Sequence, residues 1–119
     1  MPRALPASPG SFDPKAVAQA RKVLKKNEKA LPRMADLYKL LANPVRLKIL
    51  MSLSEIDRMC VGDLSKVLDL SIAATSHQLK MLKDQRWLGA EGEGKHVYYY
   101  LANPDLKEAL EGDIRMLND

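Results

Sequence analysis

Cysteine, histidine and aromatic residues are scarce in this chain of 119 residues. Its single cysteine, Cys60, excludes a disulfide within one chain, and no CxxC pair is present to hold zinc. A catalytic Cys60 would need a nearby histidine as a base, and His77 and His96 lie in segments with other predicted roles. We therefore predict a protein that is not an enzyme, binds no metal and needs no cofactor.

Long apolar runs are also missing. The N-terminus lacks the apolar segment of a signal peptide, and no stretch approaches the roughly 18 apolar residues of a membrane-spanning helix. Hydrophobic residues nevertheless make up 46% of the chain, which is too high for a disordered protein. The sequence thus predicts a cytoplasmic globular protein that has no membrane partner.

Basic charge is concentrated near the N-terminus. The net charge is +4, but residues 1–35 hold eight Lys or Arg against two Asp or Glu, and the remainder holds eleven against thirteen. Net positive charge favours a polyanionic partner only weakly. Four lysines in this basic segment either form a solvated helix face or contact phosphates: Lys22, Lys25, Lys26 and Lys29.

Three Asx–Pro pairs mark helix starts, because the Asx side chain caps a helix and proline fits its first position. They are Asp13-Pro14, Asn43-Pro44 and Asn103-Pro104. Residues 1–12 contain three prolines and a glycine, and we predict a disordered N-terminal arm there. A single domain is predicted to occupy residues 13–119.

Hydrophobic periodicity completes the pattern of predicted elements. It indicates helices over residues 14–29, 32–42, 44–54, 61–68, 72–85 and 104–118. Residues 55–59 are predicted to be a polar connection, and Asp69-Leu70 a turn. β-forming residues on both sides of a glycine turn predict strands over 87–91 and 96–101. Two short helices joined by a tight turn and followed by a hairpin make a mainly α protein with a small β-hairpin, the winged helix-turn-helix.

Four stretches in order give the sequence a resemblance to the ArsR/SmtB family of small dimeric winged-helix repressors. LLANPVRLKIL at 40–50 resembles the family's LADPTRLRIL, and CVGDL at 60–64 resembles CVCDL. SIAATSHQLKML at 71–82 resembles SQSTVSHHLKLL, and GKHVYYYL at 94–101 resembles GRxVYYRL. The resemblance, which covers about residues 36–102, implies a DNA-binding transcriptional repressor.

A homodimer is also implied by the resemblance, because the family builds its dimer interface from the first and last helices. A two-fold dimer would bind an inverted-repeat operator in double-stranded DNA, with one recognition helix for each half-site. The predicted interface residues are Val17, Leu24, Leu106, Leu110, Ile114 and Leu117.

The helix predicted over 72–85 is the candidate recognition helix. Ile72, Leu79 and Leu82 are expected to hold it against the core, which leaves its N-terminal half for the major groove. Gln78 is expected to read adenine. The predicted DNA contacts in and next to this helix are Ser71, Ala73, Ala74, Thr75, Ser76, His77, Gln78 and Lys80.

The wing supplies Lys95 and His96 as further predicted DNA contacts, because a basic wing tip commonly reaches phosphate or the minor groove. Glu93 at the same tip would be repelled by phosphate. Arg46 and Lys66 either contact phosphates or are solvated helix charges. A neutral reading region with Glu91 and Glu93 leaves open an alternative, a winged-helix protein-interaction module that does not bind DNA.

The metal-site residues common in the family are replaced here. Gly62 occupies the position of the second cysteine in the CVC pattern, and the family's histidine pattern in the last helix is replaced by Asn103, Asp105, Met116 and Asp119. Cys60 is either a small buried residue or a sensor in a thiol-, redox- or metal-responsive repressor. The effector is not identified by the sequence.

Overall fold

The computed structural model describes residues 10–119. The chain divides into two compact units, one ending at Lys39 and the other formed by Leu40–Asp119, and each is described by itself. Most of the arm predicted over residues 1–12 lies outside the described residues. In the part of the chain that is described, no helix has both the length and the apolar character needed to cross a membrane.

The first unit contains α1 (Pro14–Lys26) and most of α2 (Ala30–Leu41). Asp13 caps α1 as predicted, because its Oδ1 accepts hydrogen bonds from the backbone N–H groups of Lys15 at 2.9 Å and Ala16 at 3.2 Å. The helix ends three residues earlier than predicted, at a cap formed by Asn27. All thirteen residues of α1 are described and none is buried; Val23 and Leu24 are exposed and Val17 is half-buried.

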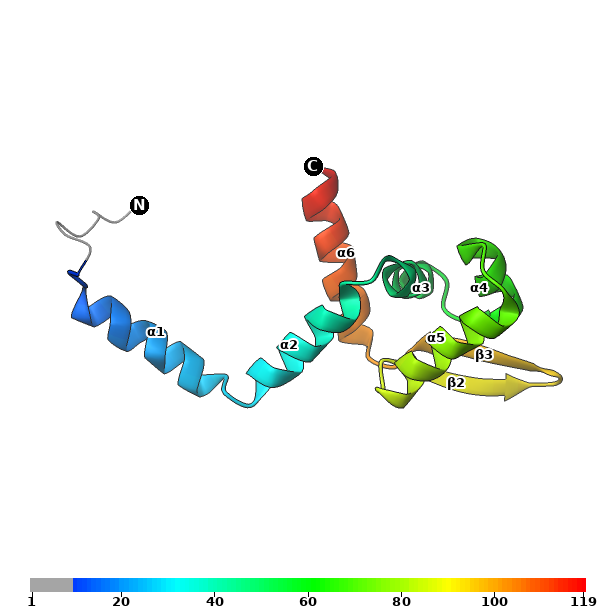
Figure 1. Ribbon diagram of the computed structural model, residues 1–119, viewed down its shortest axis with the longest axis horizontal. Helices are drawn as coiled ribbons and strands as arrows, with labels where there is room; N and C mark the ends of the chain where they lie inside the picture. Colours follow the sequence, from blue (N-terminus) through cyan, green and yellow to red (C-terminus); the bar gives the residue numbers. More distant parts are fainter. Residues whose placement is uncertain (1–9) are drawn as a thin grey trace. The chain divides into compact units, whose positions relative to one another are not determined.

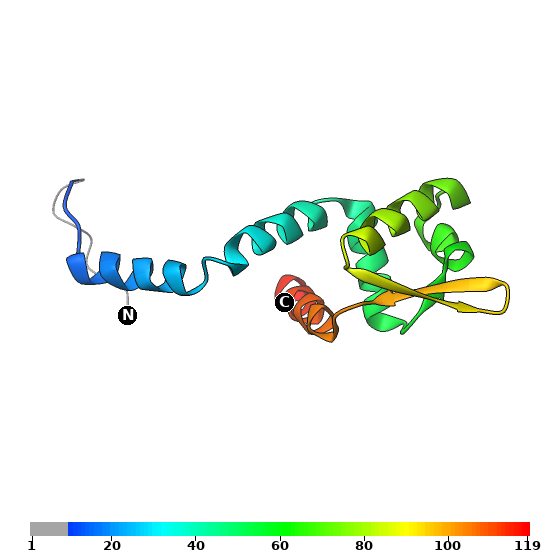
Figure 2. The same cartoon turned by 90° about the horizontal axis from the view of Figure 1, so that it is seen from below.

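The second unit contains the predicted winged helix-turn-helix, and it confirms the mainly α class with a small hairpin. Its helices are α3 (Pro44–Glu55), α4 (Val61–Leu68), α5 (Ile72–Asp84) and α6 (Pro104–Asn118). Its strands are β1 (Met59–Cys60), β2 (Leu88–Glu93) and β3 (His96–Leu101), in the order β1-β3-β2 and all antiparallel. The hairpin of β2 and β3 projects beyond α4 and α5 in both views (Figures 1 and 2).

Strand β1 corrects the polar connection that the sequence predicted over residues 55–59. Met59 pairs with Tyr99 and Cys60 with Tyr98. A strand of two residues is too short to give a period-2 pattern, so only its pairing with β3 defines it. This pairing ties the start of α4 directly to the wing.

Leucine and isoleucine side chains from three helices form the core of the second unit. Ile49 and Leu50 of α3, Leu64 of α4, and Leu79 and Leu82 of α5 expose none of their surface. The core therefore lies where α3, α4 and α5 meet, and it holds the helix-turn-helix as one rigid body.

Two residues of α6 that were predicted at a dimer interface are instead buried within the chain. Leu106 and Leu110 of α6 are 6% and 4% exposed within a single chain. Their periodicity marked an apolar face, but that face is already covered by the chain's own elements. Leu117, which is 78% exposed, remains available to a partner.

The turn between α4 and α5 is fixed by backbone geometry and by a cap. Asp69 takes the left-handed conformation with φ of 53°, and the Leu70 N–H donates to the Ser65 carbonyl at 3.1 Å. Ser71 then caps α5, accepting a hydrogen bond from the Ala74 N–H at 3.0 Å. The predicted turn at Asp69-Leu70 is confirmed, and it sets the direction in which α5 leaves α4.

Gly89 gives room to an aromatic ring in the sheet. It pairs with Tyr100 across β2 and β3, and an added Cβ would lie only 2.6 Å from the Tyr100 hydroxyl oxygen. We expect Gly89→Ala to lower the free energy of unfolding by about 1–3 kcal/mol, because the ring must move out of its site. Urea denaturation measures this.

Gly92→Ala is the matched control on the same strand, because its added Cβ meets no described atom within 4 Å. We expect this control to change stability by no more than about 0.5 kcal/mol. Equal effects of the two substitutions would contradict the role assigned to the Tyr100 ring.

Candidate nucleic-acid interface

The buried residues that hold helix α5 against the core differ from the predicted set by one residue. Thr75, Leu79 and Leu82 are buried, whereas Ile72 is 52% exposed. The Thr75 hydroxyl donates to the Ser71 carbonyl at 2.9 Å, so its polar atom is satisfied inside the helix. Thr75 is fully buried and cannot contact DNA, which corrects the predicted set. Ile72 was wrongly predicted to be buried.

The opposite face of α5 is open to solvent over its N-terminal half. Ser76 and Gln78 are half-buried on its flanks. The exposed predicted contacts are Ser71, Ala73, Ala74, His77 and Lys80. An exposed N-terminal half on a helix whose other side is locked into the core is the arrangement that major-groove reading requires.

Arg46 of α3 holds the side chain of Gln78. Its Nε donates to Gln78 Oε1 at 3.3 Å, and its Nη2 donates to the Met81 sulfur at 3.2 Å. A guanidinium group can only donate, so the amide oxygen of Gln78 must face Arg46 and the NH₂ group faces away. Gln78 therefore presents donors, which favours an acceptor on the base and disfavours the predicted reading of adenine, because glutamine reads adenine through both its oxygen and its NH₂ group.

The wing carries the two predicted basic contacts close to its turn. Gly94 has a φ of 62°, which glycine adopts without strain. Lys95 and His96 follow it and are exposed. The turn thus brings a cation to the end of the hairpin that lies farthest from the core.

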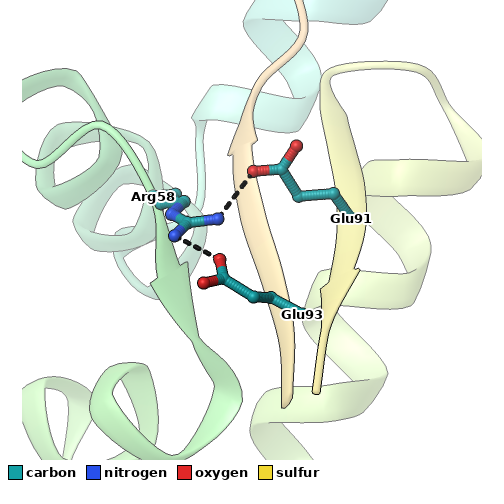
Figure 3. A network of polar contacts seen from close by, with 3 residues as sticks. All are labelled: Arg58, Glu91 and Glu93. Atoms are coloured by element: carbon teal, nitrogen blue, oxygen red, sulfur yellow. Dashed lines mark hydrogen bonds and ion pairs between the residues drawn. The ribbon is translucent and has the colours of Figure 1, made fainter. Parts of the chain in front are cut away.

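Arg58 pairs with both carboxylates that were predicted on the wing and offsets one of their two negative charges (Figure 3). Its Nη1 pairs with Glu91 at 3.0 Å, its Nη2 pairs with Glu93, and its guanidinium lies 4.4 Å from the centre of the Tyr98 ring. Hydrogen bonds to Glu93 and then to Glu91 raise the pKa of Arg58. This cluster could not be recognised from the sequence, because Arg58 lies 33 residues from Glu91.

An open cleft of about 580 Å³ separates the start of α5 from the wing. Cys60 and Lys66 line it on one side, Ile72 and Ser76 belong to α5, and Lys95 belongs to the wing. Cys60 is half-buried in this wall. Over residues 10–119, His, Cys, Asp and Glu side chains form no group of three or more that is arranged to hold a metal ion.

The second unit therefore has the parts of a winged helix-turn-helix DNA-binding protein: a recognition helix exposed at its N-terminal half, a preceding helix joined to it by a tight turn, and a hairpin with Lys95 at its turn. Residues 43–87 match the family model described as "Bacterial regulatory protein, arsR family". The chain is 35% identical over 80 residues to the cadmium resistance transcriptional regulatory protein CadC of Listeria innocua, with 67% of each chain covered. It belongs to the ArsR family and is a DNA-binding transcriptional regulator.

Solved structures support the same fold. Reduced HlyU from Vibrio cholerae superposes with a TM-score of 0.70 at 32% identity, covering 78% of this chain and 97% of HlyU. The winged helix-turn-helix domain Mb0332 from Mycobacterium bovis, described as homodimeric, has a TM-score of 0.67 at 24% identity, covering 93% and 91% of the two chains. The predicted fold class and family are therefore confirmed.

Proposed function

We propose that the chain represses transcription by binding an inverted-repeat operator as a homodimer. This proposal rests on the contrast between the buried face and the exposed face of α5. Its Thr75, Leu79 and Leu82 are locked into the core, and its opposite face is exposed from Ser71 to Lys80. The relatives are transcriptional regulators, and we propose no catalytic role for any residue.

The proposed major-groove contacts come from α5 and its cap. Small side chains there allow the helix to approach closely, while the imidazole and the ammonium group reach base edges or phosphate. The Gln78 amide acts as a donor because Arg46 occupies its oxygen side. The proposed contacts are Ser71, Ala73, Ala74, Ser76, His77, Gln78 and Lys80.

We expect the cleft beside α5 to accommodate the sugar-phosphate backbone of one DNA strand, which runs between the major groove and the neighbouring minor groove. Lys66 and Lys95 line this cleft, and both can contact phosphate. His96 follows on the wing. Arg58 supports this arrangement because it pairs with Glu91 and Glu93 and so weakens their repulsion of the strand.

Exposed apolar side chains support the homodimer. In the described part of the chain several of them lie on α1, α2 and α6, while others lie on α3, α4, α5 and β3, and large groups of exposed apolar side chains mark protein interfaces. They include Val23, Leu24, Leu31, Met34, Tyr38, Met116 and Leu117. We propose that residues 13–119 work as one dimerising domain whose interface includes Val17, Leu24, Ile114 and Leu117.

Leu117→Glu tests the proposed interface. Because this side chain is 78% exposed, the change should leave the chain folded. We expect the mass by light scattering to fall from twice 13.3 kDa to 13.3 kDa, and operator affinity to fall by about tenfold or more. Ile56→Glu, at a residue 50% exposed at the end of α3, is the control and should stay dimeric. A dimeric Leu117→Glu variant would contradict the interface.

Selection from random duplex DNA tests the function itself. The purified chain should enrich an inverted repeat whose half-sites are centred about one helical turn apart. Its affinity for that site should fall steeply with salt, because phosphate contacts release counterions. A selection that enriches no sequence would favour the alternative of a protein-interaction module.

A further inference from the structure

Ile72 is an exposed branched apolar side chain at the first position of α5. It is 52% exposed, and it lines the cleft between α5 and the wing together with Ser76, Lys95 and Val97. A single exposed isoleucine is ordinary on a protein surface. Its position here, one residue after the Ser71 cap of the recognition helix, is what makes it informative.

The start of α5 offers no side-chain hydrogen bond to a base. Ile72, Ala73 and Ala74 occupy the first three helical positions, and all three are exposed. Base edges in the major groove present hydrogen-bonding groups for every pair, but only thymine adds an apolar group there, its C5-methyl. An apolar helix start therefore discriminates by burying a methyl group rather than by hydrogen bonding.

Local geometry holds Ile72 in one place. Ser71 accepts a hydrogen bond from the Ala74 N–H at 3.0 Å, and the Ser71 carbonyl accepts from both the N–H and the hydroxyl of buried Thr75. The backbone on both sides of Ile72 is thus fixed, and a β-branched side chain in a helix has one strongly preferred rotamer. A rigid apolar group of this kind can select a base by shape.

From these observations we infer that Ile72 is a specificity-determining residue that packs against the C5-methyl of a thymine in each half-site. This inference rests on the proposed function, because it needs α5 in the major groove. Ser76 lies one helical turn further on in the same cleft wall, and Lys95 lies on the wing side. Both would hold the neighbouring phosphates while Ile72 reads the base.

The test removes the apolar group first from the DNA side and then from the protein side of the contact. Each thymine of the selected site is replaced in turn by deoxyuridine, which lacks only the C5-methyl. Wild-type affinity should fall by about fourfold at one thymine, or about fifteenfold when both half-sites are changed. The Ile72→Ala variant should bind the thymine site more weakly than the wild type by a similar factor, and it should bind the deoxyuridine site as the wild type does. The Ile72→Val variant should keep most of the wild type's preference for the thymine site over the deoxyuridine site.

Val67→Ala is the matched control, because Val67 is also branched and 52% exposed, but it lies on α4 outside the cleft lining. It should bind both sites as the wild type does. The inference is overturned if Ile72→Ala retains full discrimination at every thymine, or if no thymine is sensitive. A wild-type chain that selects no DNA sequence would instead overturn the proposed function.

Discussion

Ala73→Glu is expected to lower operator affinity by about 100-fold or more. Ala73 is exposed at the second position of α5, so a carboxylate there would face the phosphates and base edges of the groove. Bringing like charges together at an interface costs several kcal/mol, and each 1.4 kcal/mol is a factor of ten. Gel shift or fluorescence anisotropy on the selected operator measures the loss.

Folding should not suffer from this change. A glutamate in the first turn of a helix interacts favourably with the free N–H groups, so the stability of Ala73→Glu should equal or exceed that of the wild type. Met51→Glu adds the same charge on α3 at a residue that is 43% exposed. We expect this control to change affinity by only about threefold. If Ala73→Glu bound the operator as tightly as the wild type does, the proposal that α5 contacts DNA would be contradicted.

Leu79→Ala is expected to lower the free energy of unfolding by about 2–5 kcal/mol. Leu79 exposes none of its surface, so the change deletes buried methyl groups and leaves a cavity among tightly packed neighbours. The midpoint of thermal unfolding should fall by about 10 °C or more. Circular dichroism with heat and with urea measures both quantities.

Lys80→Ala, at the next position along α5, is the stability control because Lys80 is exposed. It should change stability by no more than about 0.5 kcal/mol while lowering DNA affinity. The two neighbouring substitutions thus separate the two sides of the helix. A loss below about 1 kcal/mol for Leu79→Ala would contradict the packing described for the core.

Short-range chemistry explains why so much of the fold could be predicted. Asp13, Asn43 and Asn103 each precede a proline, and all three cap a helix in the structure. Ser71 and the turn at Asp69-Leu70 are set by neighbours within a few residues. Features that depend on such local contacts can be recognised from the sequence alone.

Helix ends without such signals were placed less well. Helix α5 ends at Asp84 rather than at residue 85, and Arg86 takes the left-handed conformation with φ of 68°. Glycine usually occupies this position, so an arginine there gives no sequence signal of a helix end. The Trp87 N–H, which donates to the Leu82 carbonyl at 2.9 Å, closes the helix instead.

The burial of individual side chains and the contacts between distant segments could not be predicted. Hydrophobicity alone favoured Ile72 over Thr75 for the buried stripe, but Thr75 satisfies its hydroxyl on the Ser71 carbonyl and takes the core position. Arg58 meets Glu91 and Glu93 only because β1 pairs with β3. The residues on the exposed face of α5 could therefore be assigned only once the three-dimensional packing was known.

Amide chemical shifts of the labelled protein, recorded as operator DNA is added, test most directly that α5 and the wing read DNA. We predict the largest changes at residues 71–80 and 93–97, with the core residues of α3 little affected. Large changes confined to other segments, with the signals of 71–80 unmoved at saturation, would contradict the account.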